Sequence, residues 1–203
     1  MTERRTFQRP LGEKRYKKLF IISAEGYKTE PLYFGIFNNE RAVVRVSCLK
    51  TKHHSSPPHV LKRMTDSLKV SGLKSSDEAW LVVDRDNWSE EQLLQLHQWS
   101  LEKENYGLAL SNPKFEYWLL LHYEDGAGIT SSNDCTTRLK HWMPGYDKGL
   151  DTRKINPTQI SDAIRRAKKR DQPACLDWPR DLGQTTVYRL IEKILNAHID
   201  QTN

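Results

Sequence analysis

The chain has 203 residues, of which 29% are charged and 37% are hydrophobic, and its formal net charge is +6. This length suits one compact domain with a substantial core, and the ordinary numbers of Gly and Pro exclude a collagen-like or wholly disordered chain. The chain has no apolar run long enough to cross a bilayer and no hydrophobic stretch typical of a signal peptide, so we expect a cytoplasmic protein without membrane association.

The first half of the chain alternates between strand and helix patterns. Four segments rich in apolar or β-branched residues predict strands, and they lie at 19–22, 42–49, 79–83 and 106–110. Apolar residues at helical spacing follow each of them, and these helix patterns lie at 31–37, 56–68, 89–101 and 113–122. Such alternation favours an α/β fold with a mostly parallel four-stranded sheet covered by helices, whose ligand chemistry lies at the carboxyl ends of the strands.

Specific residues mark where several helices begin. Ser89 and Gln92 form a capping box, and Asn156 precedes a proline at the start of a later helix. Asn112 is expected to cap the fourth helix, with Pro113 in its first turn. The apolar residues of that helix, among them Phe115, are expected to lie in the core rather than to form a stacking platform.

The remainder of the chain contains no evident strand. It predicts a short helix at 136–142, a helix from 156 and a last helix around 187–194. We therefore divide the chain into a basic N-terminal arm (1–17), an α/β core (18–125) and a helical C-terminal part packed on the same domain (126–203).

Positive charge is concentrated in two segments. Residues 1–18 carry a net charge of +5 and residues 138–170 one of +7, which leaves −6 for the rest. The second segment contains a cluster on one helix face, namely Arg165, Arg166, Lys168, Lys169 and Arg170. These residues are candidates to bind nucleic-acid phosphates, although such a cluster also serves simply to solvate a helix.

Acidic residues follow two of the predicted strands. Glu25 comes after the first strand, and Asp84 and Asp86 come after the third. The carboxyl ends of parallel strands open on the same edge of a sheet, and positions i and i+2 of an extended segment point to one side, so we expect these carboxylates to converge. Like charges at close range repel unless a cation lies between them, and carboxylates suit Mg²⁺ or Mn²⁺.

Several stretches resemble known families. A Glu-Gly pair follows the first predicted strand in 20–26 (FIISAEG), and an Asp-x-Asp pair follows the third in 81–86 (LVVDRD). This combination resembles the Toprim fold of topoisomerases, primases and overcoming-lysogeny-defect-type nucleases. The chain is also similar to the RloB-like family, which is related to the AbiLii abortive-infection proteins. This similarity is carried by the two stretches above together with Thr29-Glu30, Tyr33-Phe34, the string SNPKFEYWLLLH (111–122) and Thr185-Thr186-Val187. This resemblance implies a Toprim-like (Rossmann-like) core, a role in anti-phage defence and a gene often beside an ATPase.

Further residues are candidates for the same site. Glu116 lies one helical turn after Asn112. The similar nucleases use additional acids to bind a second metal, which makes Glu116 a candidate for that role. Alternatively, its negative charge only interacts favourably with the positive N-terminus of a helix. Lys28 and Lys114 are placed to approach a scissile phosphate or to lie on the surface. The loop histidines His53, His54 and His59 offer acid-base chemistry or only solvation.

The sequence therefore predicts a metal-dependent nuclease. Asp84 and Asp86 are expected to hold Mg²⁺ or Mn²⁺, Glu25 to act as ligand or base, and Glu116 to help place a second ion. The expected partner is nucleic acid, either RNA, with tRNA a candidate by family analogy, or DNA. The alternatives are a non-catalytic regulatory subunit that binds nucleic acid or an ATPase, and a D-x-D nucleotidyl or glycosyl transferase. The chain has no phosphate-binding loop of the G-x-x-x-x-G-K-[ST] type, so any ATP dependence comes from a partner.

Overall fold

The computed structural model describes residues 18–38, 44–50, 56–85, 88–147 and 149–199. Its strands are β1 (Lys18–Ala24), β2 (Val44–Cys48), β3 (Glu78–Asp84), β4 (Tyr106–Asn112) and β5 (Gln184–Thr185). Its helices are α1 (Thr29–Gly35), α2 (Pro57–Ser71), α3 (Glu90–Ser100), α4 (Phe115–Leu120), α5 (Ser132–Trp142), α6 (Pro157–Arg170) and α7 (Val187–Ile199), with a short 3-10 helix at Thr152–Lys154. None of these helices combines the length and hydrophobicity that a membrane span requires.

The strands form one mixed sheet in the order β2-β1-β3-β4-β5. The first four strands are parallel, as the alternation of strand and helix patterns predicts, so their carboxyl ends lie along one edge. Asp84 at the end of β3 is in register with Ser111 of β4, and Ala24 at the end of β1 with Val82 of β3. The loops that follow β1, β3 and β4 therefore meet at one place.

The expectation of four strands is wrong, because β5 adds a fifth that runs antiparallel to β4. Its two residues, Gln184 and Thr185, pair with Asn112 and Ser111. The hydroxyls of Ser111 and Thr185 lie 2.8 Å apart and share a hydrogen bond. A two-residue polar strand has no apolar run, so hydrophobic patterning gives no sign of it.

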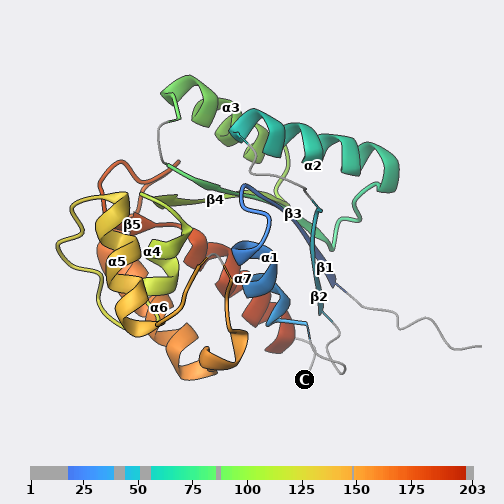
Figure 1. The fold of residues 1–203 in the computed structure, drawn as a ribbon. Coiled ribbons are helices and arrows are strands. Elements are labelled where there is room, and N and C mark those ends of the chain that lie inside the picture. Colours follow the sequence, from blue (N-terminus) through green and yellow to red (C-terminus); the bar gives the residue numbers. More distant parts are fainter. Residues whose placement is uncertain (1–17, 39–43, 51–55, 86–87, 148, 200–203) are drawn as a thin grey trace, which may run out of the picture.

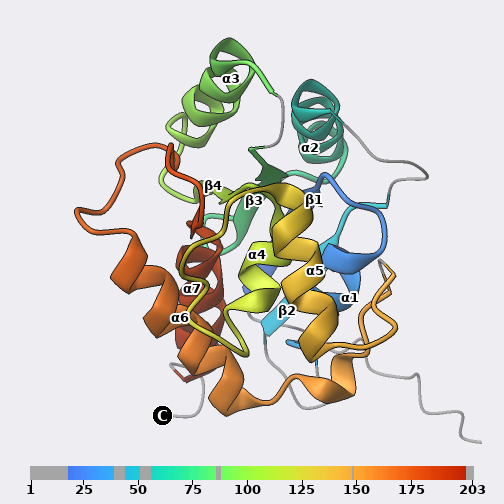
Figure 2. The same ribbon diagram turned by 60° about the vertical axis from the view of Figure 1, so that its left-hand side comes forward.

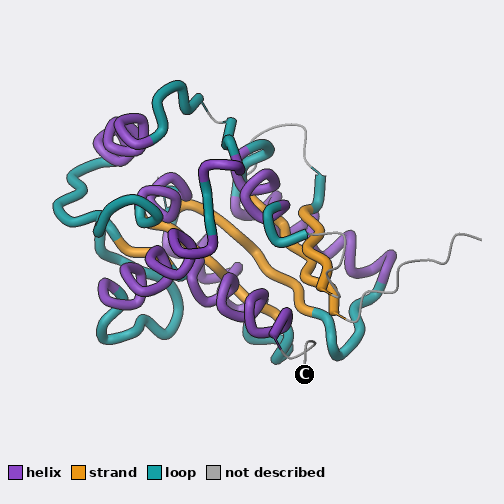
Figure 3. The backbone as a smooth tube through the Cα atoms, turned by 90° about the horizontal axis from the view of Figure 1, so that it is seen from below, coloured by secondary structure: helices purple, strands orange, loops and turns teal. Residues whose placement is uncertain are grey.

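Helices cover both faces of the sheet (Figure 1). In the strands, alternate residues point to opposite faces, so Phe20 and Ile22 belong to one core cluster while Ile21 belongs to the other. The smaller layer consists of α2 and α3, whereas α1, α4, α5, α6 and α7 cover the opposite face (Figures 1 and 2). Figure 3 views the molecule from the side of this larger layer, with its helices in front of the strands.

The capping prediction is confirmed for two helices and wrong for a third. Ser89 with Gln92 and Asn156 with Gln159 form complete capping boxes at α3 and α6. Asn112, however, is the last residue of β4, and its side-chain amide donates to the carbonyl of Arg180. Helix α4 starts only at Phe115, because pairing with β5 keeps Asn112 extended.

Candidate active site

Four carboxylates line one cavity of about 340 Å³ at the carboxyl edge of the parallel strands. They are Glu25, which follows β1, Asp84 at the end of β3, Glu30 in the first turn of α1, and Glu116 in the first turn of α4. The three glutamates are buried, each with at most 9% of its surface exposed. The structure therefore brings together Glu25, Asp84 and the further candidate Glu116, while Asp86, which was expected to converge with Glu25 and Asp84, lies outside the described residues.

Asp84 lies within the negative field of the other three. Burial raises the pKa of its carboxyl group well above the ordinary value, and the charges of Glu30, Glu25 and Glu116 raise it further. One hydrogen bond lowers the pKa of Asp84: the backbone N–H of Phe115, at the start of α4, donates to Oδ1 over 2.8 Å. The geometry holds the carboxylate in place, while its neighbours make a negative charge there unfavourable.

Glu25 is held by two neutral donors. Its Oε2 accepts the backbone N–H of Asp84 over 3.1 Å, and its Oε1 accepts the indole N–H of Trp88 over 3.2 Å. The backbone N–H of Glu25 donates in turn to the carbonyl of Val82, which extends the pairing of β1 with β3. These bonds fix Glu25 beside Asp84.

Glu30 is a site residue that the sequence analysis did not assign. Its Oε1 accepts the backbone N–H of Gly26 over 2.9 Å, and the carboxylate lies so close above Gly26 that a Cβ there would overlap it. Glycine at position 26 is therefore needed to leave room for this carboxylate. The available signal was the Thr29-Glu30 pair that is similar to the RloB-like family, five residues after Glu25 and at the start of the helix that follows β1.

Glu116 is positioned by Tyr146. The Tyr146 hydroxyl donates to Oε1 of Glu116 over 3.2 Å and lies 3.3 Å from the hydroxyl of Thr29. Burial, and then the charge of Glu116, raise the pKa of Tyr146, so the phenol stays protonated as a donor. Tyr146 comes from the loop after α5, far from the predicted motifs in sequence, and the pattern of residues gave no sign of it.

The family model for RloB-like proteins matches residues 20–194, a range that contains all four carboxylates. The chain belongs to the RloB-like family. No curated protein and no protein of solved structure shows significant similarity to it.

Two lysines of this RloB-like protein also line the carboxylate cavity. Lys28 is exposed, with its ammonium 5.4 Å from the centre of the Tyr27 ring. Lys114 is half-buried, and its Nζ donates to the hydroxyl of Thr136. Both predicted phosphate-binding lysines are thus placed beside the acids rather than elsewhere on the surface.

The donor set fits a hard divalent cation in its chemistry, since all four side chains offer carboxylate oxygens. The room left at Gly26 for the Glu30 carboxylate is a further feature of such a site. As the side chains stand, no group of three or more His, Cys, Asp or Glu within the described residues is arranged to hold a metal ion. Binding of a cation would therefore require the carboxylate oxygens to move closer together within the cavity.

Some predicted residues lie outside the described part of the chain. They are Asp86, His53, His54 and the basic arm 1–17. His59 is described: it lies exposed in the first turn of α2, and its Nδ1 is 3.0 Å from the hydroxyl of Ser56. Phe115 is buried in the core, as expected.

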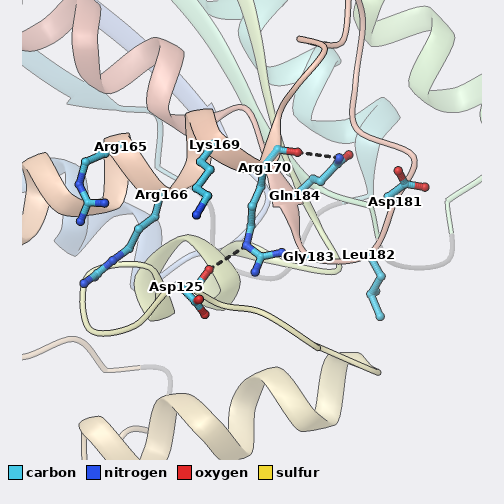
Figure 4. Close-up of a pocket in the computed structure, with 9 residues that line it drawn as sticks. All are labelled: Asp125, Arg165, Arg166, Lys169, Arg170, Asp181, Leu182, Gly183 and Gln184. Atoms are coloured by element: carbon cyan, nitrogen blue, oxygen red, sulfur yellow. Dashed lines mark hydrogen bonds between the residues drawn. The ribbon is translucent and has the colours of Figure 1, made fainter.

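Four of the five basic residues predicted on α6 line a second cavity, shown in Figure 4. They are Arg165, Arg166, Lys169 and Arg170. Lys168 does not line it, because its ammonium forms an ion pair of 2.6 Å with Glu192 of α7. The structure thus separates the predicted basic cluster into a cavity-lining group and one residue that joins two helices.

Proposed function

We propose that this RloB-like protein is a metal-dependent nuclease that hydrolyses phosphodiester bonds of nucleic acid at the carboxylate cavity. The observation that carries the proposal is the convergence of Glu25, Glu30, Asp84 and Glu116 on one cavity at the carboxyl edge of a parallel sheet. Two like charges about 4 Å apart repel by roughly 4 kcal/mol at an effective dielectric constant of 20. An anionic phosphodiester adds to this repulsion, so the site suits such a substrate only when divalent cations balance the charge.

The chain's own groups would prepare the cavity for this chemistry. The four carboxylates are the residues that would hold one or two Mg²⁺ or Mn²⁺ ions, which supply activation of water and stabilisation of the leaving oxygen. The N–H groups of Phe115, Trp88 and Gly26 orient three of the carboxylates without adding charge. Lys28 and Lys114 provide positive charge at the cavity wall for the phosphate oxygens.

The biological setting follows from the family resemblance. The order of Glu25 after β1 and Asp84 at the end of β3 supports a Toprim-like core, and the likeness to the AbiLii type supports a role in abortive infection. We include in the proposal a cytoplasmic location and an ATPase partner protein. The proposed substrate is either RNA, with tRNA as the first candidate, or DNA. Phosphate and metal chemistry are common to both nucleic acids, so the experiment must include each.

The test is a cleavage assay on total tRNA, single-stranded RNA and plasmid DNA, each with Mg²⁺, Mn²⁺ or EDTA. Wild-type protein is compared with Asp84→Asn and with the matched control Asp66→Asn, which changes an exposed aspartate of α2 that pairs with Lys62. We expect metal-dependent cleavage by the wild type and by Asp66→Asn, and none by Asp84→Asn. Cleavage that survives in Asp84→Asn would contradict the assignment of the site.

A non-catalytic role is the second candidate, because a basic cavity offers binding that needs no metal ion. In that case no substrate is cut under any condition, while nucleic acid or the ATPase still binds in EDTA. The same assay, followed by a binding measurement in EDTA, separates this regulatory subunit from the nuclease.

A further inference from the structure

The second cavity has a volume of about 630 Å³ and lies between α6, the turn after α4 and the segment that leads into β5. Four cationic side chains and two carboxylates line it, namely Arg165, Arg166, Lys169, Arg170, Asp125 and Asp181. Figure 4 shows the side chains of Lys169 and Arg170 directed into this space, with Asp125 and Asp181 at its borders. The lining therefore carries an excess of two positive charges.

The amphipathic pattern of α6 explains why the cations gather on one side. Ile160, Ala163 and Ala167 are buried against the larger helix layer at spacings of three and four residues. Lys169 and Arg170 come after these buried residues in the last turn of α6 and line the cavity. Lys168 instead pairs with Glu192 of α7. Two lysines adjacent in sequence thus have separate surroundings.

The guanidinium groups of Arg166 and Arg170 each donate to a backbone carbonyl. Arg166 Nη1 donates to the carbonyl of Leu121, and Arg170 Nε donates to the carbonyl of Asp125, each over 2.7 Å. A backbone carbonyl fixes the direction of a guanidinium without cancelling its charge. Asp162 forms an exposed ion pair of 2.9 Å with Arg165 and a longer one of 3.9 Å with Arg166, while Lys169 forms none with the described residues.

The basic cavity and the carboxylate cavity lie toward opposite ends of α4, a helix whose own residues are all buried. Glu116 in the first turn of α4 lines the carboxylate cavity, and the carbonyl of Leu121 just past its last turn accepts from Arg166. The six residues of α4 span about 9 Å. At the sheet, Gln184 of the basic cavity pairs with Asn112, two residues before Lys114 of the carboxylate cavity.

We propose that the basic cavity binds a backbone phosphate of the nucleic-acid strand, a few nucleotides from the bond that lies at the carboxylate site. The inference rests on the proposed nuclease function and adds the path of the strand, over the mostly exposed loop that runs from Asp125 of the basic cavity to Ser132 of the carboxylate cavity. Arginine presents several N–H donors in a plane that matches phosphate oxygens, and Lys169 adds a mobile point charge. Asp125 opposes the bound anion, so its charge limits the affinity of the site.

The test compares Lys169→Gln with Lys168→Gln, two substitutions at exposed positions that change net charge equally. Only Lys169 lines the cavity, whereas Lys168 pairs with Glu192. Binding of fluorescent single-stranded RNA and DNA 12-mers is measured by anisotropy in EDTA, which prevents metal-dependent cleavage, at several salt concentrations. Loss of one phosphate contact lowers the slope of log K against log salt by about 0.7, which corresponds to roughly fivefold weaker binding at 0.1 M salt. We expect this change for Lys169→Gln only, and tighter binding for Asp125→Asn.

Equal losses in Lys169→Gln and Lys168→Gln would overturn the inference, since they would show a diffuse effect of net charge. Displacement of the 12-mer by equimolar AMP or inorganic phosphate would also overturn it, because the cavity would then take a small free anion. The binding measurement and the cleavage assay test the two proposals separately. Cleavage with unchanged binding in Lys169→Gln rejects the strand path alone, whereas selective binding without any cleavage rejects the nuclease function.

Discussion

The backbone N–H of Asp84 donates to Oε2 of Glu25 over 3.1 Å, so the ends of β3 and β1 are joined through a carboxylate. Without such donors, neighbouring carboxylates would turn apart to reduce their repulsion. Phe115 and Gly26 supply the same kind of neutral N–H to Asp84 and Glu30. The fold thus concentrates negative charge by means of backbone groups whose positions the sheet and helix starts determine.

Removing one charge from this cluster should stabilise the protein when no divalent cation is present. Asp84→Asn keeps an oxygen to accept the Phe115 N–H but removes the repulsion from Glu25, Glu30 and Glu116. We expect the free energy of unfolding in EDTA to rise by about 1 kcal/mol, as is common when a strained functional site is relieved. Urea denaturation in EDTA measures it, and a less stable Asp84→Asn protein would argue against the repulsion described.

The room at Gly26 should matter for the site more than for the fold. A Cβ at position 26 would overlap the Glu30 carboxylate, and the backbone there is not in the left-handed region, so alanine brings no other strain. We expect Gly26→Ala to weaken divalent-cation binding by roughly 10- to 100-fold, as for groups that orient metal ligands. The shift of the melting temperature with Mg²⁺ reports this change.

Gly35→Ala is the matched control, because a Cβ at position 35 would meet no atom within 4 Å. It should leave the response to Mg²⁺ unchanged and, as an alanine at the end of α1, alter stability by no more than about 1 kcal/mol. Should both alanine variants respond to Mg²⁺ like the wild type, Glu30 has no part in cation binding.

His122 should make the fold sensitive to acid. It is buried, its Nε2 lies 3.1 Å from the hydroxyl of Tyr33, and its Nδ1 lies 3.0 Å from the carbonyl of Trp118, an arrangement that suits the neutral ring. Burial, with a smaller contribution from the charge of Arg166, lowers its pKa to about 4, against about 6.5 for an unfolded chain. Between these values the unfolded state binds more protons, so stability falls as the pH falls.

The full effect amounts to about 3 kcal/mol once the pH is below 4. Urea unfolding of the wild type and of His122→Gln, followed from pH 7 to pH 4.5, isolates it from the titration of the carboxylates. We expect the stability difference between the two proteins to shrink steadily below pH 6.5. Parallel pH profiles would show that His122 does not stay neutral in the folded state.

Sequence patterning was sufficient for the central fold because β1 and β3 are apolar runs buried on both faces of a parallel sheet. Their polar ends placed Glu25 and Asp84 at one edge without any knowledge of side-chain contacts. The fifth strand escaped the same reasoning, since Gln184 and Thr185 are held by pairing with β4 and not by hydrophobicity.

The site was predictable only where its residues follow a strand or begin a helix in a recognised motif. Glu116 met that condition and was assigned, and Glu30, in the Thr29-Glu30 pair at the start of α1, met it without being assigned. Tyr146 joins the site from a loop after α5 through a tertiary contact. The separate directions of Lys168 and Lys169 likewise depend on where α7 packs against α6. Contacts between distant segments are set by packing, which a single sequence does not display.

If the four carboxylates form one divalent-cation site, the isolated protein binds Mn²⁺. Titration with Mn²⁺ measures this binding and requires neither the substrate nor an activating partner. Isothermal titration calorimetry of the wild type, Asp84→Asn and the Asp66→Asn control measures the affinity. We predict saturable binding of one or two ions, weakened at least tenfold in Asp84→Asn and unchanged in Asp66→Asn. Equal binding by all three proteins, or no binding at millimolar Mn²⁺, would contradict the account.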